Sequence, residues 1–307
     1  MTKIFIDGSA GTTGLRIRER LSARKDIELI TLSEDVRKDL NARREALNAA
    51  DIAFLCLPDQ AAAEAVALID NPNTAVIDTS TAHRTAAGWV YGMPELHGQR
   101  ERLAAARRIA NPGCHASGFI ALVAPLVRSG VVAKDARLAC FSLTGYSGGG
   151  KKMIAEYESA DRSPLFDAPR QYGLSQQHKH LREMAVVCGL DNPPGFSPIV
   201  ADYYSGMEVS VQLFNTNIDE IKSIYKAVYR GPVIKYAQDA DEAGFLSAAA
   251  FSGRDDMAVT VHGNDERALL TARFDNLGKG ASGAAIQNMN LLMGVCETEG
   301  LAIGVDE

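Results

Sequence analysis

The sequence predicts an α/β protein with a doubly wound, Rossmann-type parallel sheet and a second, α+β domain. Over the first 110 residues, short apolar segments alternate with amphipathic helical segments, as in a parallel sheet covered on both faces. From about residue 197, apolar and polar residues alternate with a period of two, which is typical of half-buried antiparallel strands. The length of 307 residues favours two domains, because a typical domain is about half as long.

The elements of the first domain follow from apolar periodicity. Its strands are short, continuously apolar runs, and its helices carry Ala, Leu and charged residues at helical spacing. In chain order we expect a strand at 4–6, a helix at 14–23, a strand at 28–32, a helix at 42–50, a strand at 52–57, a helix at 61–69 and a strand at 75–78.

The second domain begins with a turn and a long apolar helix. Asn111-Pro112-Gly113 has turn chemistry, and residues 115–127 are apolar at helical spacing. After these we expect a strand at 137–143, a glycine-rich segment at 144–150, a strand at 209–214, an amphipathic helix at 219–229, strands at 257–262 and 269–274, and a final helix at 283–293.

Composition narrows the functional classes. Apolar residues make up 46% of the chain, charged residues 23%, and the net charge is −6, as expected of a soluble globular protein. Basic residues are dispersed, so we expect no nucleic-acid partner, and no apolar run approaches the roughly 18 residues that span a bilayer. The first residues have the pattern of a strand rather than a signal peptide. The five cysteines form no CxxC pair, which argues against a disulfide framework or a structural zinc site and favours the reducing cytoplasm.

A glycine-rich segment joins the first strand to the first helix. Glycines let the backbone turn tightly beside a pyrophosphate, whose charge a helix N-terminus stabilises. The spacing is GxxGxxG rather than GxGxxG, but its place between strand and helix predicts a dinucleotide-binding site. An ordinary glycine-rich turn is the alternative. The candidate cofactor-binding residues are Gly8, Ser9, Ala10, Gly11, Thr12, Thr13 and Gly14.

The segment after the second strand decides between NAD and NADP. An acidic residue there binds the ribose diol of NAD, whereas a hydroxyl with a cation binds the 2′-phosphate of NADP. Ser33 and Arg37 favour NADP, and Glu34 and Asp35 are expected to face solvent. We therefore expect NADP(H) as the cofactor.

Cys114 is the candidate nucleophile, because it stands where the turn opens the long helix. Backbone N–H groups and the positive end of the helix dipole favour a thiolate at such a position. From this segment alone, a small buried cysteine of a core helix is the more common alternative.

The segment from His178 to Glu183 contains the second catalytic candidate. If this segment is helical, His180 and Glu183 lie on one face, so the carboxylate can orient the imidazole and raise its basicity. His178 and His180 are also possible zinc ligands, but no third ligand is evident, and we expect no metal. Two incidental surface histidines are the other alternative.

Two further loops are candidates for anion binding. Residues 78–84 follow a strand at the carboxyl edge of the parallel sheet, where open sheets bind ligands, and Arg84 can pair with a phosphate or carboxylate. Residues 146–152 offer glycine N–H groups with Lys151 and Lys152 behind them. A plain surface loop is the alternative for each.

Taken in order, these motifs resemble the N-acetyl-γ-glutamyl-phosphate reductase family of arginine biosynthesis, in its shorter form. Aspartate-semialdehyde dehydrogenases are the nearest relatives of that family in fold and chemistry. The resemblance covers essentially the full length and is carried by residues 8–14, 78–84, 91–96, 111–117, 147–151, 178–183 and 275–290.

The resemblance implies roles for individual residues. The nucleophilic cysteine of the family falls on Cys114, its catalytic histidine on His180, and its neighbouring acid on Glu183. Further implied cofactor-binding residues are Ser80, Lys279, Gly280 and Gln287. The implied substrate-binding residues are Arg84, Ser147, Gly148, Gly149 and Lys151.

The resemblance also implies a domain division and an assembly. The last helix is expected to return to the first domain, so the NADP-binding domain comprises 1–112 together with about 283–307. Residues 113–282 then form the catalytic, substrate-binding and oligomerisation domain. The family is oligomeric, which implies a homo-oligomer, either a dimer or a tetramer.

The chain departs from the longer form of the family at two positions. His115 replaces a tyrosine after the cysteine, and Arg182 replaces a proline before the acid. His115 is thus a rival base to His180, although a neighbouring side chain on a helix points away from Cys114. The arginine with which semialdehyde dehydrogenases bind the substrate carboxylate has no identified equivalent, and the candidates are Arg170, Arg182, Lys151 and Lys152.

The implied reaction is the NADPH-dependent reduction of an acyl phosphate, N-acetylglutamyl 5-phosphate, to N-acetylglutamate 5-semialdehyde. A thioester on Cys114 is the expected intermediate. Three alternatives remain: an aspartate-semialdehyde dehydrogenase, a catalytically silent NADP-binding regulatory protein, and a thiol hydrolase that needs no dinucleotide.

Overall fold

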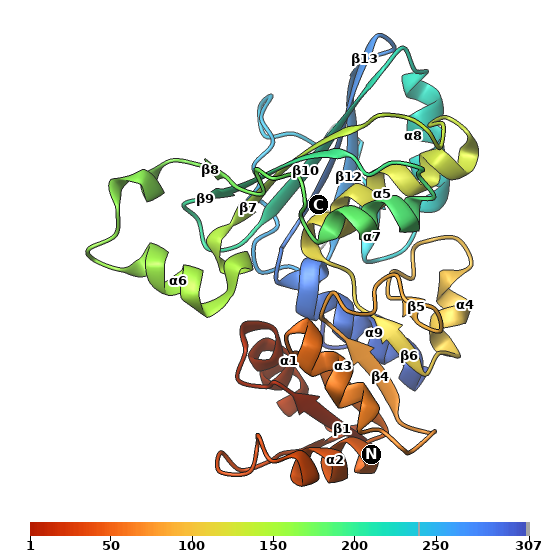
Figure 1. Cartoon of the computed structure of the whole chain (residues 1–307). Helices are drawn as coiled ribbons and strands as arrows, with labels where there is room; N and C mark the ends of the chain where they lie inside the picture. The colour runs from red at the N-terminus through yellow and green to blue at the C-terminus, as the bar shows by residue number, and fades with distance from the viewer. Residues whose placement is uncertain (239, 305–307) are drawn as a thin grey trace. The chain divides into compact units, whose positions relative to one another are not determined.

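The computed structural model describes residues 1–238 and 240–304 and divides into two compact units (Figure 1). Unit 1 comprises Met1–Pro112 and Ala281–Leu301, and unit 2 comprises the described residues of Gly113–Gly280 and residues 302–304. The chain therefore changes unit at three places. The last three residues of the expected first-domain segment, 305–307, lie outside the described residues.

Unit 1 contains a six-stranded, entirely parallel sheet, as the sequence predicts. The strand order is β2-β1-β3-β4-β6-β5. The strands are β1 (Thr2–Asp7), β2 (Ile27–Ile30), β3 (Ile52–Leu55), β4 (Ala75–Asp78), β5 (Val90–Tyr91) and β6 (Arg108–Ala110). The helices are α1 (Thr12–Ser22), α2 (Leu40–Ala49), α3 (Asp59–Ala67), α4 (Gln99–Ala104) and α9 (Gly283–Met293).

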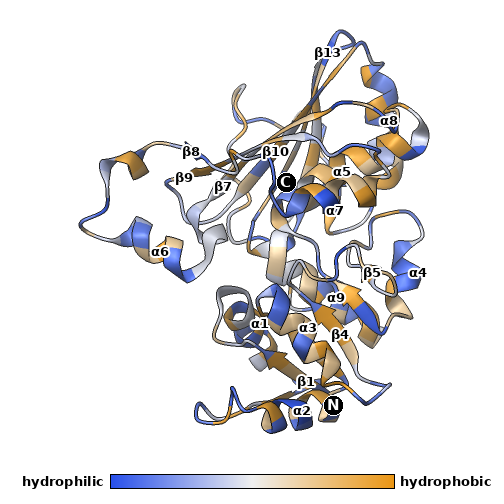
Figure 2. Ribbon diagram, in the orientation of Figure 1, coloured by the Kyte–Doolittle hydropathy of each residue, from blue (hydrophilic) through white to orange (hydrophobic). Residues whose placement is uncertain are grey.

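Apolar side chains cover both faces of this sheet, so unit 1 is doubly wound. One buried cluster joins the sheet to Ile17 of α1 and to Ile286 and Met289 of α9. A second cluster joins it to Leu47 of α2 and Ala62 of α3. Figure 2 shows β4 as a largely hydrophobic strand and α2 as largely hydrophilic. The expected alternation of buried strands and amphipathic helices is thereby confirmed.

Unit 2 is built on a seven-stranded mixed sheet in the order β11-β12-β13-β10-β7-β9-β8. The central pairs β12·β13, β10·β13 and β10·β7 are antiparallel, whereas β7·β9 and β11·β12 are parallel. Its strands are β7 (Ala139–Gly145), β8 (Arg170–Gln171), β9 (Gly195–Ala201), β10 (Met207–Phe214), β11 (Ile234–Tyr236), β12 (Met257–Asn264) and β13 (Arg267–Phe274). Its helices are α5 (Cys114–Ser129), α6 (Gly150–Glu158), α7 (His180–Cys188) and α8 (Ile218–Val228).

Helix α5 packs closely on this sheet and is supported by α8. A Cβ atom on Gly118 would lie 2.5 Å from the Val209 side chain, so the helix approaches β10 more closely than an ordinary residue allows. Pro125 lies inside α5 and has no N–H to donate to the carbonyl of Ala121. The hydroxyl of Tyr229, which ends α8, donates to that carbonyl instead. The helix therefore continues past its proline to Ser129.

Among the described residues, no helix is both long enough and apolar enough to cross a membrane.

Candidate active site

Cys114 is the first residue of α5 and follows the Asn111–Gly113 turn, as predicted. Gly113 is the helix N-cap with extended backbone angles, and no side chain caps the helix there. The Ser117 backbone N–H, at 2.8 Å, and its hydroxyl, at 3.0 Å, both donate to the Gly113 carbonyl and close the first turn. The thiol is partly exposed. The N-terminus of α5 is the positive end of the helix dipole, and this position stabilises the thiolate form of Cys114.

Helix α7 supplies Glu183 to the same turn. One carboxylate oxygen of Glu183 accepts a hydrogen bond from the Gly113 N–H at 2.8 Å, and the residue is only 2% exposed. His180, the first residue of α7, is also buried. Both residues therefore belong to the buried face of one helix, whose first turn contacts the turn before Cys114. The bond to Gly113 was not predicted, because nothing in the spacing relates two segments so far apart.

A cluster of rings surrounds the next residue, His115. Its ring centroid lies 5.6 Å from that of His180 and 5.7 Å from that of His178. Its Nδ1 lies 2.7 Å from the Ser142 hydroxyl and its Nε2 lies 2.5 Å from the Tyr172 hydroxyl. Both nitrogens of His115 are thus engaged in hydrogen bonds within the core. This argues against His115 as the base for Cys114.

Tyr172 is a site residue that the sequence analysis missed. Its hydroxyl binds His115, and burial together with the negative charge of the Cys114 thiolate raises the pKa of Tyr172. The phenol therefore stays protonated and can donate a hydrogen bond close to the thiol. No motif marks it, and its position shortly before His178 is the one signal that the sequence offers.

The pKa of His115 leads to a prediction about acid stability. Burial and the neighbouring His178 lower the pKa of His115 to about 3 from an ordinary value of 6.5. Between these values the unfolded chain holds a proton that the folded protein does not. The free energy of unfolding should thus fall as the pH is lowered from about 6.5 toward 3, by up to about 1.4 kcal/mol per pH unit.

The substitution His115→Gln retains a donor and an acceptor for Ser142 and Tyr172 but cannot titrate. It is expected to remove this contribution to the pH dependence, measured by urea denaturation at a series of pH values. Identical pH slopes for the two proteins would contradict the assignment of a neutral, buried His115.

Gly280 lies directly against the nucleophile. A Cβ atom at this position would be 3.0 Å from the Cβ of Cys114 and 3.1 Å from the Asp275 carbonyl oxygen. Its neighbour Lys279 is only 2% exposed, in a short π-helix at Gly278–Ser282. In unit 2, a side chain at the predicted cofactor residue Gly280 would therefore crowd Cys114, and the contact of Gly280 with a cofactor stays a prediction.

The residues of the glycine-rich segment after β7 differ in their exposure to solvent. Ser147 is 1% exposed, and its hydroxyl accepts from the Asn276 side chain at 3.0 Å. Gly148, Gly149 and Lys151 are exposed, around the start of α6. The substrate-binding roles predicted for these four residues stay predictions, and the Ser147 side chain already has a partner within the protein.

The cationic candidates for the substrate carboxylate differ in their surroundings. The Arg170 guanidinium stacks 3.7 Å from the ring centroid of Phe166 and donates to the Tyr157 hydroxyl. Arg182 is exposed on α7, and Lys152 lies 3.9 Å from Glu156. Arg170 therefore serves at least a packing role in unit 2.

In unit 1, the glycine-rich loop from Gly8 to Gly11 connects β1 to α1. Gly8 has a φ of +86°, and a Cβ there would lie 2.3 Å from the Cys56 carbonyl oxygen. A Cβ on Gly14 would lie 2.5 Å from the Gly8 carbonyl. Helix α1 begins at Thr12 without a side-chain cap. The loop thus presents backbone at a helix N-terminus, as a pyrophosphate requires.

A pocket of about 290 Å³ adjoins this loop. Two ion pairs lie on its wall: Arg43 with Asp7 at 2.8 Å, and Arg37 with Glu34 at 2.7 Å. Among its lining residues are Gly8, Ser9, Arg18, Arg37, Lys38 and Arg43. The positive charges and the glycine backbone fit a dinucleotide with an extra phosphate.

Ser33 stands beside this pocket rather than in its wall. Its hydroxyl bonds to Asp35 and lowers the pKa of that carboxyl, and its carbonyl accepts from the Arg37 N–H. The cations on the wall that the sequence analysis did not name are Arg18, Lys38 and Arg43. They come from α1, from the segment after β2 and from α2, so only the fold brings them together.

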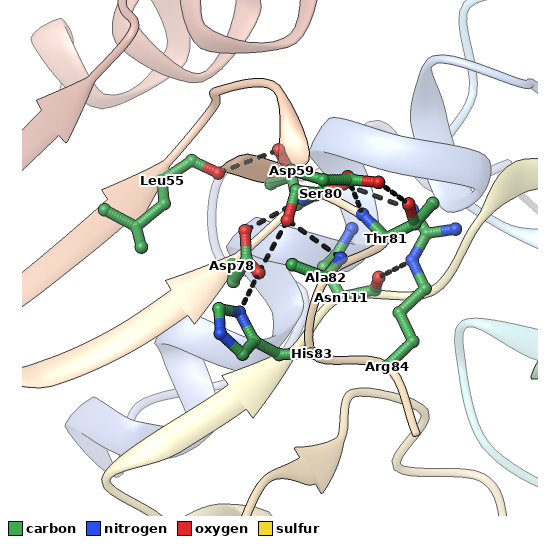
Figure 3. Close-up of polar contacts among 10 residues, drawn as sticks. Leu55, Asp59, Asp78, Ser80, Thr81, Ala82, His83, Arg84 and Asn111 are labelled. Atoms are coloured by element: carbon green, nitrogen blue, oxygen red, sulfur yellow. Dashed lines mark hydrogen bonds and ion pairs between the residues drawn. The ribbon is translucent and has the colours of Figure 1, made fainter. Parts of the chain in front are cut away.

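The loop after β4 is organised by the buried carboxylate of Asp78 (Figure 3). Asp78 accepts from the Ser80 N–H at 2.9 Å, the Ser80 hydroxyl at 2.8 Å and the His83 Nδ1 at 2.6 Å. The Ser80 hydroxyl also accepts from the Ala82 N–H. The Ser80 side chain therefore shapes the loop, and the cofactor contact predicted for it stays a prediction.

Arg84 ends this loop and is bound to main chain on both sides. Its Nε donates to the Asn111 carbonyl at 3.0 Å, and its Nη2 donates to the Thr79 carbonyl at 3.1 Å (Figure 3). The predicted phosphate-binding arginine thus holds the loop to the strand-end residue Asn111.

Gln287 lies in α9 and is completely buried. Its Nε2 donates to Glu95 at 2.9 Å and to Glu297 at 2.8 Å. This residue anchors α9 to the rest of unit 1, and its predicted cofactor contact stays a prediction.

The described residues include no group of three or more His, Cys, Asp or Glu side chains arranged to hold a metal ion.

Comparison with known families gives two matches. Residues 3–106 match the model "Semialdehyde dehydrogenase, NAD binding domain", and residues 114–276 match "Semialdehyde dehydrogenase, dimerisation domain". Together these matches cover most of the chain.

Curated relatives match over nearly the full length. N-acetyl-gamma-glutamyl-phosphate reductase 2 from Nostoc sp. is 45% identical over 320 residues, which cover 97% of this chain and 99% of the relative. The protein of the same name from Pseudomonas putida is 43% identical over 311 residues, with 97% and 98% covered.

Solved structures share the fold at low sequence identity. Aspartate semialdehyde dehydrogenase II from Vibrio cholerae has a TM-score of 0.72 at 17% identity, covering 95% of this chain and 98% of its own. Aspartate semialdehyde dehydrogenase with NADP from Candida albicans has a TM-score of 0.64 at 14% identity, with the same coverage. At such identities the similarity concerns the fold alone.

Proposed function

Because the chain belongs to the N-acetyl-γ-glutamyl-phosphate reductase family, we propose that it reduces N-acetylglutamyl 5-phosphate to N-acetylglutamate 5-semialdehyde in arginine biosynthesis. The observation that carries this proposal is the turn before Cys114. It presents the thiol at the start of α5 and is bound through Gly113 to Glu183, on the helix that begins with His180.

Cys114 is the nucleophile of the proposed reaction. Its sulfur attacks the acyl carbon, a carbon–sulfur bond forms, and the bond from that carbon to the phosphate oxygen breaks. Inorganic phosphate leaves, and the acyl group remains on Cys114 as a thioester. Backbone N–H groups at the start of α5 stabilise the oxyanion that develops during the attack.

His180 is the general base and general acid of the proposed reaction. It accepts the thiol proton before the attack and donates a proton to the carbonyl-derived oxygen once the thioester carbon is reduced. The hydroxyl proton then returns to His180 as the carbon–sulfur bond breaks, which releases the semialdehyde and the Cys114 thiolate. Glu183 holds Gly113 throughout and so fixes the turn that carries the sulfur.

The glycine loop and the adjoining pocket of unit 1 are the proposed NADP(H) site. The backbone of the loop from Gly8 to Gly14 would hold the pyrophosphate at the start of α1, and Arg37, with its neighbouring cations, would bind the 2′-phosphate. NADPH bound there would supply the hydride that reduces the thioester carbon.

In this proposal, one unit binds the cofactor and the other carries the catalytic residues. Unit 1 is the NADP-binding domain, and unit 2 is the catalytic and oligomerisation domain of a homo-oligomer, as a dimer or tetramer. The dimerisation-domain match over residues 114–276 supports the assembly. All five cysteines are free, which supports a cytoplasmic location.

The reverse reaction tests the proposal. With inorganic phosphate and NADP+, the protein should oxidise N-acetylglutamate semialdehyde and form NADPH, with no activity when phosphate is omitted. Aspartate semialdehyde should react about 100-fold less efficiently, since it lacks the N-acetyl group and is one carbon shorter. Preferred turnover of aspartate semialdehyde would assign the chain to aspartyl-phosphate reduction, and NADP binding without turnover of either aldehyde would favour a regulatory protein.

A further inference from the structure

Asn111 directly follows β6, three residues before Cys114, and its backbone is bound on both sides. Its N–H donates to the Asp78 carbonyl at 2.7 Å, and its carbonyl accepts from the Nε of Arg84 at 3.0 Å. Both partners belong to the β4 strand end and its loop, which Asp78 itself organises. The backbone of Asn111 is therefore fixed to the carboxyl edge of the parallel sheet.

The side chain of Asn111 is fixed to the last helix. Its Nδ2 donates to the Ala281 carbonyl at 3.0 Å, just before α9, and its Oδ1 accepts from the Nδ2 of Asn288 at 3.3 Å. Asn288 is itself completely buried and also donates to the Gly92 carbonyl at 3.0 Å. With an exposure of 1%, Asn111 has each of its polar groups in a hydrogen bond inside unit 1.

The other end of the turn is fixed in unit 2. The Gly113 N–H is bound by Glu183 at 2.8 Å, and Pro112 is the one residue between the two anchors. The ring of proline locks its φ angle. The residues on either side of Pro112 are therefore each anchored by hydrogen bonds within their own unit.

We propose that Asn111 is a positioning residue: its hydrogen bonds tether the turn that carries Cys114 to the unit that carries the glycine loop. The inference rests on the proposed function. Attack by the thiol depends on Cys114 and its surroundings in unit 2, whereas hydride transfer also depends on the cofactor-binding unit. Loss of the Asn111 bonds should therefore slow hydride transfer and leave the reactivity of the thiol unchanged.

The variant Asn111→Ala tests this inference in the full-length protein. A single turnover of N-acetylglutamate semialdehyde with NADP+ and phosphate, followed by NADPH absorbance, reports the hydride step. Alkylation of Cys114 by iodoacetamide, followed by peptide mass spectrometry, reports thiol reactivity. We expect the hydride step to slow by about 10- to 100-fold and alkylation to stay within about twofold of wild type.

Asn48→Ala is the matched control. The Asn48 side chain also makes hydrogen bonds inside unit 1, donating to the Arg44 and Leu68 carbonyls and accepting from the Asp70 and Asn71 N–H groups. Its loss should lower the melting temperature and leave both rates at wild-type values. A purely structural role for Asn111 would give Asn111→Ala the same behaviour as this control.

Each outcome decides one point. Unchanged rates in folded Asn111→Ala, or an equal slowing of hydride transfer and alkylation, would overturn the positioning role. If Asn111→Ala does not fold, Asn288→Ala removes one of the four hydrogen bonds and should show the same selective slowing to a smaller extent. A wild-type protein that forms no NADPH from N-acetylglutamate semialdehyde would refute the proposed function instead.

Discussion

Replacing Cys114 with alanine is expected to lower the reductase rate by about 10⁴-fold or more, because no other group can form the thioester. Cys114 is partly exposed at the start of α5. Cys140 and Cys188, in contrast, are buried, and burial raises the pKa of both thiols. The loss should appear in kcat of the phosphate- and NADP-dependent oxidation of N-acetylglutamate semialdehyde.

The matched control is Cys296→Ala, which removes an exposed thiol from the segment after α9. This variant should retain the wild-type rate. Mass spectrometry of the protein mixed with acyl phosphate but no NADPH should detect an acyl adduct in the wild type and none in Cys114→Ala. Retention of more than a trace of activity by Cys114→Ala would remove the thioester from the mechanism.

Replacing His180 with asparagine is expected to lower kcat by about 10²- to 10⁴-fold, the usual contribution of a positioned acid–base group. His180 opens α7, and Glu183 of the same helix binds the turn before Cys114. The substitution keeps a short polar side chain at the helix start, so KM for the semialdehyde should change little. The pH–rate profile should lose the limb that His180 contributes.

His262→Asn is the control for this experiment, since His262 lies in β12. It should keep both the rate and the pH profile. His115→Asn offers a further comparison, because His115 is bound to Ser142 and Tyr172 and should affect stability more than the pH profile. A His180→Asn protein with a wild-type pH profile would assign the proton transfers to another group.

The fold could be predicted where local pattern carries the information. The central strands β3 and β4 of unit 1 are buried throughout and were predicted from their apolar runs, and α9 was predicted with its observed bounds of Gly283–Met293. The short elements β5, α4 and β6 were missed. They are held by distant contacts, such as the bonds from the Gln99 side chain to Tyr91 and from Asn288 to Gly92, which no local window contains.

In the candidate site, too, local features could be predicted from the sequence and long-range contacts could not. The place of Cys114 at a helix start could be predicted from turn chemistry and helical spacing, and so could the shared helix of His180 and Glu183. The bond from Glu183 to Gly113 and the pairing of His115 with Tyr172 could not, because they join segments that only the packing of α5 against its neighbours brings together. Side chains such as Ser80 and Ser147 match the family motifs, but sequence alone does not show that their hydroxyls are bound within the protein.

The return of the chain to unit 1 through α9 has a consequence for synthesis on the ribosome. Ile286 and Met289 complete one of the two buried clusters of unit 1, yet they are translated only after nearly all of unit 2. The amino-terminal segment of unit 1, Met1–Pro112, must leave the exit tunnel with this apolar face of its sheet only partly covered, by α1. Cotranslational folding is therefore expected to finish unit 2 first, and the nascent amino-terminal segment is a natural client for chaperones until α9 arrives.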